Sequence, residues 1–372
     1  MSDEKKKNEM WLTTENPAIM FENTDVGRLK KEVWDASEEE IERILAEYEV
    51  PSLPELGKPG SYIQTTLRQR LIENRRKNDI VIIPVGCTEN HGRHTISGLD
   101  TFMVTQIAEA LRRYTAKEDR PVNLALPPLN YGAHPYHHIG MPGTVNIPQD
   151  AVRELLIYVM LGLWNDGFRK QIIINNHGQL WVLESALHEF MYRYQLPGVF
   201  QVLDWHRGVR EFFGPTGKKD SMETHFVHAD EAETSVALLM FPQGTVDISL
   251  AQDTEGEGFL PDGHFDKSVD PLRRPHRWSE GEGQMAIEIA ATPEGTVGSP
   301  SLASAGKAKR PITAILKYLT LVIDQILEAF PPGKVPLVEK VTLRGASEME
   351  PYLKEPQSEG WKSVYELPRI GF

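Results

Sequence analysis

The chain has 372 residues, of which 40% are hydrophobic and 25% charged, a balance typical of globular proteins long enough for one large or two smaller domains. Its 53 acidic and 40 basic residues give a net charge of −13, which argues against nucleic acid or an anionic membrane as a partner. The N-terminus lacks the apolar segment of a secretory signal, and no apolar run is long enough to span a bilayer. Cys87 is the only cysteine, which excludes disulfides within the chain, and we expect a cytoplasmic protein.

The first 75 residues predict an appended region with one clear helix. Ser37 and Glu40 have the spacing of a capping box. Apolar side chains recur at helical spacing directly after them, at Ile41, Ile44, Leu45 and Tyr48. Residues 50–61 are rich in Pro and Gly, a composition typical of a linker.

From about residue 79 onward, short apolar strands alternate with helices. Strands are predicted at 80–85, 122–129, 171–175 and 198–204, and helices at 100–113, 150–164, 180–190, 229–240 and 311–330. Asp150 is expected to cap the second of these helices, with Gly167 after its end, and Pro311 to open the last. Residues 243–300 are rich in Gly, Pro and Asp and are expected to be mostly irregular. The alternation predicts an α/β fold with a mainly parallel sheet covered on both faces.

Polar residues gather directly after the first predicted strand. Glu89 and His91 can face one point, because residues two apart in extended chain point the same way. Asp100 begins the next helix, where a loop can fold it back toward them. Cys87 lies next to the strand and is expected to be a small buried hydrophobe.

Two other strand and helix ends offer further donors of the same kind. His177 follows the third predicted strand, and His228 and Glu233 flank the start of the helix at 229–240. Ligands of parallel sheets bind beyond the carboxyl ends of the strands, which is where all these residues are expected. Any one histidine here could simply be a hydrogen-bonded core residue. Together, the imidazoles and carboxylates suit one or two divalent ions such as Zn²⁺, Mn²⁺ or Fe²⁺, and a carboxylate can bridge two ions.

A histidine-rich loop follows the second predicted strand, at the same edge of the sheet. His134, His137 and His138 could recognise a polar substrate or move a proton, or they could be exposed residues of a Pro/Gly loop. The tight turn that follows them ends in Thr144, whose hydroxyl could contact a ligand.

Five motifs, in order, resemble the creatininase (creatinine amidohydrolase) family. They are PVGCTENHGRHTISGLD (84–100), HHIGMPGTVNI (137–147), INNHGQ (174–179), HADEAETS (228–235) and GTVGSPSLASAGKAK (295–309). The resemblance implies a three-layer α/β/α fold, a site for two divalent metal ions and a homo-oligomer, commonly a hexamer. It places the metallohydrolase domain at 76–333, with an N-terminal extension at 1–75 and a C-terminal extension at 334–372.

Carried over by position, the resemblance implies five metal ligands: Glu89, His91, Asp100, His177 and Glu233. It implies that Asp100 bridges the two ions, that His228 acts as the general acid or base, and that His138 faces the substrate. Gln179 stands where creatininase has an acidic ligand, and we expect it, with Thr144, to contact the substrate. This change argues against creatinine as the substrate, as does Gly178 in place of an aromatic residue.

The residues and the resemblance together predict a hydrolase that opens a small polar ring by attack of metal-bound hydroxide on a carbonyl, without an organic cofactor. The substrate could be a cyclic amide, as for creatininase, or a keto-inositol such as 3-dehydro-scyllo-inosose, whose carbon–carbon bond some similar enzymes hydrolyse. The departures from creatininase favour the keto-inositol. A non-catalytic metal-binding protein is the alternative from another class. An isomerase or aldolase would differ from a hydrolase because only hydrolysis must incorporate solvent oxygen.

Overall fold

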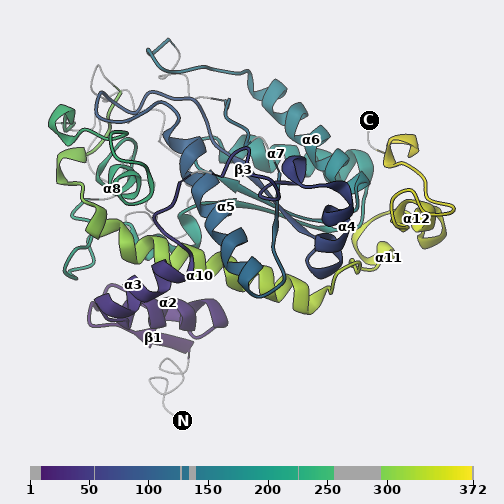
Figure 1. Ribbon diagram of the computed structural model, residues 1–372, viewed down its shortest axis with the longest axis horizontal. Helices are drawn as coiled ribbons and strands as arrows, with labels where there is room; N and C mark the ends of the chain where they lie inside the picture. The colour runs from purple at the N-terminus through teal and green to yellow at the C-terminus, as the bar shows by residue number, and fades with distance from the viewer. Residues whose placement is uncertain are drawn as a thin grey trace.

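The computed structural model describes residues 10–370 except residues 54, 126–127, 134–139, 225 and 255–294. Its main sheet has four parallel strands in the order β4-β3-β5-β6 (Figure 1). The strands are β3 (Ile80–Val85), β4 (Asn123–Leu124), β5 (Lys170–Asn175) and β6 (Val199–Asp204). The predicted parallel sheet is therefore confirmed. Of the predicted strand 122–129, β4 covers Asn123–Leu124 and Leu129 forms an isolated parallel bridge with Val85, while residues 126–127 lie outside the described residues.

Helices cover both faces of this sheet, which confirms the three-layer α/β/α architecture. Ile80 and Ile82 of β3 face a core shared with α5, α8 and α10, whereas Val81 and Ile83 face a second core shared with α4, α6 and α7. The first layer contains α5 (Leu99–Lys117), α8 (Glu231–Met240) and α10 (Ala305–Ala329), and the second contains α4 (Arg68–Lys77), α6 (Gln149–Asn165) and α7 (Leu180–Tyr194). Every residue of β3 and β5 is buried, as expected of strands covered on both faces.

The strand order locates a crevice at one edge of the sheet. The chain passes from β3 outward to β4 on one side, and then to β5 and β6 on the other side of β3. The connections therefore diverge between the carboxyl ends of β3 and β5, and a doubly wound sheet binds its ligands at such a switch point.

The N-terminal region packs on α10, on the side away from the sheet (Figure 1). It consists of a hairpin, β1 (Trp11–Thr13) and β2 (Met20–Glu22), followed by α2 (Asp25–Asp35) and α3 (Glu38–Glu47). The predicted helix is α3, and the Ser37 hydroxyl accepts a hydrogen bond from the Glu40 N–H at 3.2 Å, as its capping pattern predicts. Part of the segment expected to be a linker is fixed on α5, because the Glu55 N–H and the Tyr62 hydroxyl donate hydrogen bonds to Glu109 at 2.9 and 2.5 Å.

Two predicted helix starts were wrong. α10 begins at Ala305, with Ser304 at its N-cap, and Pro311 lies buried inside the helix. Proline removes one helical hydrogen bond there, which the buried apolar face that follows it offsets. Asp150 lies in the first turn of α6 instead of capping it, and its carboxylate still lies near the positive end of the helix dipole. Gly167 follows α6 at φ +90, the left-handed conformation expected for a glycine that ends a helix.

The remaining described residues form short elements around this frame. They are the helices α11 (Val338–Val341) and α12 (Ala346–Leu353) and the 3-10 turns η1 (Ile63–Thr65), η3 (Arg207–Phe212), η4 (Ile248–Leu250), η7 (Pro300–Leu302) and η8 (Val364–Glu366). The C-terminal elements pack on the same core as α6 and α7. Of the region expected to be irregular, residues 255–294 lie outside the described residues, and the rest holds only η4 and part of η7. In the described part of the chain, no helix combines the length and apolar character that crossing a membrane requires.

Candidate metal and active site

The loop after β3 brings two predicted ligands into the crevice. Glu89 and His91 are almost fully buried, and the Glu89 N–H donates to the Ser97 carbonyl at 2.9 Å, which closes the loop. His91 Nδ1 lies 3.0 Å from the Glu89 carbonyl oxygen. A carbonyl oxygen only accepts, so Nδ1 carries the hydrogen and Nε2 presents its lone pair to the crevice. Nε2 lies 3.3 Å from Asp100 Oδ1 and 3.7 Å from Glu233 Oε2.

Asp100 reaches this point because the first turn of α5 lies directly against the end of β3. A Cβ atom at Gly86 would come within 2.4 Å of the backbone of Thr101, so only glycine allows this approach. The Thr101 hydroxyl donates to the Cys87 carbonyl at 3.1 Å and fixes the contact. Asp100 is 1% exposed and lies between the residues that follow β3 and those that follow β5.

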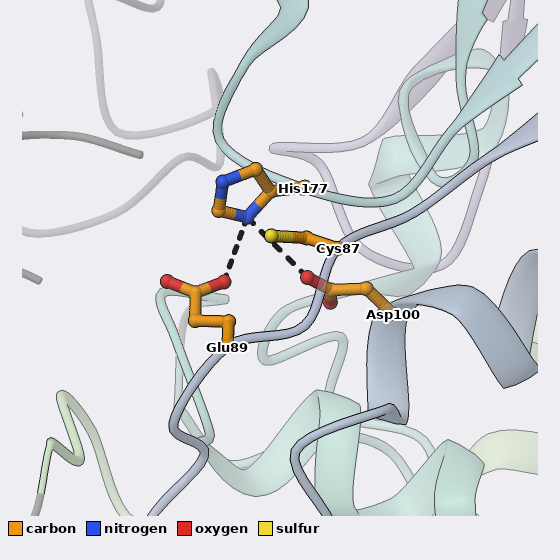
Figure 2. A group of neighbouring side chains, drawn as sticks. All are labelled: Cys87, Glu89, Asp100 and His177. Carbon is orange, nitrogen blue, oxygen red and sulfur yellow. Dashed lines mark ion pairs between the residues drawn. The ribbon is translucent and has the colours of Figure 1, made fainter. Parts of the chain in front are cut away.

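His177 enters the crevice from the end of β5 (Figure 2). Its Nδ1 lies 2.7 Å from Glu89 Oε2 and 3.3 Å from Asp100 Oδ2. Its Nε2 lies 3.0 Å from the Ala133 carbonyl oxygen, so by the same reasoning Nε2 carries the hydrogen and Nδ1 is available as a ligand.

The described residues form three potential donor groups, of which one consists of Glu89, His91 and His228. The other two share the carboxylate of Asp100. The Cys87 group consists of Cys87, Glu89, Asp100 and His177, and the His91 group consists of His91, Asp100 and Glu233. In each group the potential ligand atoms lie within 4.8 Å of one another. Asp100 points Oδ1 toward the His91 group and Oδ2 toward the Cys87 group. The structure therefore brings together all five residues predicted as ligands.

The chemistry of this cluster fits bound cations. Glu89, Asp100 and Glu233 place three carboxylates in a buried crevice, where uncompensated negative charge is costly. Among the described residues, His91 Nε2 and Asp100 Oδ2 are buried without a hydrogen-bond partner. Such orphaned atoms are expected where a metal ion supplies the missing interaction.

Protons occupy the ligand atoms when no cation does. Burial works to lower the pKa of His91, but Asp100, Glu233 and Glu89 outweigh it and raise this pKa to about 10. The pKa of His177 is likewise raised well above its ordinary value, against the effect of burial, by Cys87, Glu89 and Asp100. Burial raises the pKa of Glu233 well above its ordinary value, with His91 opposing and Asp100 adding to the effect. Cations that bind here must displace these protons, so their affinity depends on pH.

His228 lies beside the cluster. Its Nε2 donates to the Asn90 carbonyl at 2.9 Å and lies 3.9 Å from Glu89 Oε1, and its ring centroid is 4.5 Å from that of His91. A pair of backbone hydrogen bonds with Val297 fixes its main chain. The imidazole is thus held at the border of the crevice, next to the groups that would hold metal.

The three residues predicted to contact substrate lie in different settings. The Thr144 hydroxyl accepts a hydrogen bond from the Asn90 N–H at 3.0 Å, which ties its turn to the loop after β3. Gln179 is fully buried, and its amide bonds to the backbone of Gly86 and Ala133 and to the Asn175 side chain. His138 lies outside the described residues. Contact of these residues with substrate stays a prediction.

Sequence reasoning missed the place of Cys87. The side chain is fully buried, as expected of a small hydrophobe, and its sulfur also lies among the potential ligand atoms of Glu89, Asp100 and His177. A signal was present, because Cys87, Glu89 and His91 alternate along an extended segment, and the rule that pairs Glu89 with His91 applies equally to Cys87.

Comparisons with known proteins show the family and the fold of the chain. The family model described as "Creatininase: Creatinine amidohydrolase" matches residues 65–323. The chain is 43% identical over 306 residues to the 3-dehydro-scyllo-inosose hydrolase of Thermotoga maritima, covering 82% of this chain and 96% of that protein. It is 24% identical over 267 residues to the creatinine amidohydrolase of Pseudomonas putida, covering 68% and 90% of the two chains. The solved structure described as "Creatininase Mn" superimposes with a TM-score of 0.51 at 20% identity, covering 73% of this chain and 99% of the other. By the family model and the first of these relatives, the chain belongs to the creatininase family.

Proposed function

We propose that the protein is a metal-dependent hydrolase that opens a small polar ring, with a keto-inositol of the 3-dehydro-scyllo-inosose type as its substrate. The observation that carries this proposal is the pair of buried donor groups that share Asp100. Two observations support cation binding: His91 Nε2 and Asp100 Oδ2 are buried without a hydrogen-bond partner among the described residues, and the raised pKa values of His91, His177 and Glu233 show that positive charge is favoured in the cluster.

Two divalent ions, Zn²⁺, Mn²⁺ or Fe²⁺, would be held by Glu89, Asp100 and His177 on one side and by His91, Asp100 and Glu233 on the other. Bound there, such ions lower the pKa of a water molecule and polarise a carbonyl oxygen. The chain keeps the ligand nitrogens of both histidines aimed at the crevice through hydrogen bonds to backbone carbonyls.

His228 is the residue that we propose moves a proton. Its Nε2 donates to the Asn90 carbonyl, so Nδ1 is the nitrogen that would take up and release the proton. The ring stands against His91 at the edge of the metal cluster, where the leaving atom of a substrate would need a proton. A purely structural metal site does not require such an imidazole, which favours an enzyme over a non-catalytic metal-binding protein.

The substrate class rests on the relative that is 43% identical over 96% of its length, which is named a 3-dehydro-scyllo-inosose hydrolase. The creatinine amidohydrolase of Pseudomonas putida is only 24% identical. Gln179, whose amide is bonded to the protein, supports the same choice, because the family's acidic ligand at this position is absent and Glu233 offers a carboxylate in its place.

Turnover in water enriched in heavy oxygen tests this proposal. The metal-loaded protein is supplied with 3-dehydro-scyllo-inosose and, separately, with creatinine as the cyclic amide. Ring opening of the keto-inositol should give a carboxylate that carries one solvent oxygen, while creatinine remains unchanged. Turnover of creatinine alone would replace the substrate with a cyclic amide. A rearranged product without solvent oxygen in a new carboxylate would indicate an isomerase or aldolase.

We also propose that the protein is a homo-oligomer, a hexamer by resemblance, and that the segments before residue 76 and after residue 333 extend the catalytic domain. Support comes from apolar side chains exposed on the outer face of α6 and α7, at Leu155, Tyr158, Trp181 and Tyr192. Contacts between subunits commonly bury such side chains. Light scattering on purified protein measures the assembly, and a monomer at micromolar concentration would refute it. The cytoplasmic location stays a prediction.

A further inference from the structure

The metal-site prediction leaves two donors of the cluster unused, His228 and Cys87, and of these only Cys87 belongs to a group that contains Asp100 and His177. The side chain is fully buried, and the sulfur is grouped with the ligand atoms of Glu89, Asp100 and His177, all within 4.8 Å of one another. Figure 2 shows the sulfur beside the imidazole of His177, with the carboxylates of Glu89 and Asp100 around the same point. A thiol in this position lies beside three other potential metal ligands.

A second feature points to a cation at the same place. Asp100 Oδ2 is buried without a hydrogen-bond partner among the described residues, and it is directed into the Cys87 group, 3.3 Å from His177 Nδ1. A buried oxygen without a partner costs free energy, because nothing compensates for its lost hydration. An ion held jointly by the sulfur and this oxygen removes that cost.

The local backbone holds the thiol in this orientation. The Thr101 hydroxyl donates to the Cys87 carbonyl at 3.1 Å, and the preceding Gly86 N–H donates to the Leu129 carbonyl at 2.8 Å. Gly86 lies so close to Thr101 that a Cβ atom would contact its backbone at 2.4 Å. The residue that carries the thiol is therefore fixed from both sides, as expected of a ligand.

We propose that Cys87 is a metal ligand, and that its thiolate completes a set of four donors with Glu89, Asp100 and His177 that prefers Zn²⁺ to Mn²⁺. This inference rests on the proposed metal-dependent function. Four protein donors fill the usual coordination of Zn²⁺, and thiolate favours Zn²⁺ over the harder Mn²⁺. The His91 group has three protein donors and keeps a position open for water or substrate.

The charges of the cluster agree with a thiolate. With Cys87 ionised, the buried negative charges are those of Cys87, Glu89, Asp100 and Glu233, and two divalent cations balance these four charges. Neutrality of a buried cluster avoids the cost of uncompensated charge.

Cobalt substitution tests the thiolate directly. The apo-protein, prepared with a chelator, is loaded with Co²⁺, and its near-ultraviolet spectrum is recorded for the wild type, Cys87→Ser and Cys87→Ala. The wild type should show a thiolate-to-cobalt charge-transfer band that both variants lack. Because Cys87 is the only cysteine, no other thiol of the chain can produce this band. Competition between Zn²⁺ and Mn²⁺ should also show that Cys87→Ser lowers the preference for Zn²⁺ by about tenfold or more, since even changes in residues that only hydrogen-bond to ligands alter metal affinity by about 10–100-fold.

Glu233→Gln is the matched control. It removes a donor from the His91 group and leaves the Cys87 group intact. The variant should therefore lose the cobalt ion of the His91 group but keep the charge-transfer band, which comes from the cobalt ion of the Cys87 group. If the cysteine variants fail to fold, X-ray absorption of the wild-type zinc protein replaces them and should show a sulfur neighbour at about 2.3 Å. A wild-type protein without the band or without that sulfur, while still turning over substrate, overturns this inference alone. A protein that shows the band but opens no ring substrate overturns the proposed function and leaves Cys87 as a ligand.

Discussion

Replacing Asp100 with asparagine perturbs both donor groups with one near-isosteric change. Asp100 Oδ1 lies 3.3 Å from His91 Nε2, and Oδ2 lies 3.3 Å from His177 Nδ1, so each oxygen serves a different group. An amide keeps the shape of the side chain but removes the charge, and its NH₂ group cannot act as a ligand. Asp100→Asn should therefore weaken both metal positions at once.

The magnitude follows from the number of ligands. A structural Zn²⁺ ion with four protein ligands contributes about 10–16 kcal/mol, or about 2.5–4 kcal/mol for each ligand. Asp100 supplies one ligand to each group, so each ion should lose about 3 kcal/mol of binding free energy, a factor on the order of 10² in its dissociation constant. The fold should persist in the variant, since the change lies at the sheet edge and creates no cavity.

The assay is metal content per chain by elemental analysis, followed by competition with a fluorescent zinc chelator. Asp204→Asn is the control, because Asp204 is also a buried carboxylate near the sheet edge but lies outside both donor groups, bonded to Asn175 and Arg207. The control should keep two ions per chain, and Asp100→Asn should lose both at limiting metal. A folded Asp100→Asn protein that binds two ions with wild-type affinity would refute the shared carboxylate.

Three further predictions concern the proposed proton donor His228, the pKa of His91 in the metal-free protein, and the buried ion pair between Lys170 and Asp79 at the other end of the strands. His228→Asn should lower the turnover number by about 10²–10⁴ while metal content is unchanged, and parallel loss of metal would show a ligand instead. In the metal-free protein, the carboxylates outweigh burial and raise the pKa of His91 from 6.5 to about 10, so the folded state binds a proton that the unfolded state releases. Stability in chelator should therefore fall as pH rises from 6.5 to about 10, and urea titrations that show a constant or rising stability would contradict this. In the wild type, Lys170 Nζ lies 2.6 Å from the buried carboxylate of Asp79. Lys170→Met removes this ammonium group and leaves the carboxylate without a partner of opposite charge. It should cost about 3–5 kcal/mol of unfolding free energy without loss of metal, and a cost below about 1 kcal/mol would be inconsistent with a buried ion pair.

The sheet could be predicted because its central strands are fully buried. The sequence IVIIPV of β3 and the run QIIIN of β5 are continuous apolar stretches of strand length, a pattern that depends little on distant residues. The rule that ligands bind beyond the carboxyl ends of strands then placed Glu89 and His177 at one point, and the structure brings them to 2.7 Å.

Elements that depend on distant packing could not be predicted in this way. α4 has the sequence RQRLIENRRK, which has no clear apolar stripe, and Arg75 at its buried face pairs with Glu355 of the C-terminal region at 2.5 Å. A local sequence pattern cannot predict a partner that lies so distant in the sequence. The start of α10 was predicted wrongly for a similar reason. Its first turn carries few apolar residues, and Pro311, which follows that turn, is a residue type common in the first turn of helices.

Within the site, sequence reasoning found the residues that the structure brings together but not their division into groups. His91 and His94 belong to the same loop, yet His94 Nε2 lies 3.0 Å from the Thr234 hydroxyl and takes part in neither donor group. The difference arises from the approach of α8, which is a tertiary contact. Cys87 was predicted to be a small buried hydrophobe; the structure confirms the burial and adds that the sulfur lies beside the donor atoms of Glu89, Asp100 and His177.

Anomalous diffraction from crystals of the metal-loaded protein tests the central claim most directly, because it counts the ions and places them. The account predicts two peaks about 3.5–4 Å apart, one on each side of Asp100, with Cys87 and His177 beside the first and His91 and Glu233 beside the second. A single peak, or two peaks without Asp100 between them, would contradict the account.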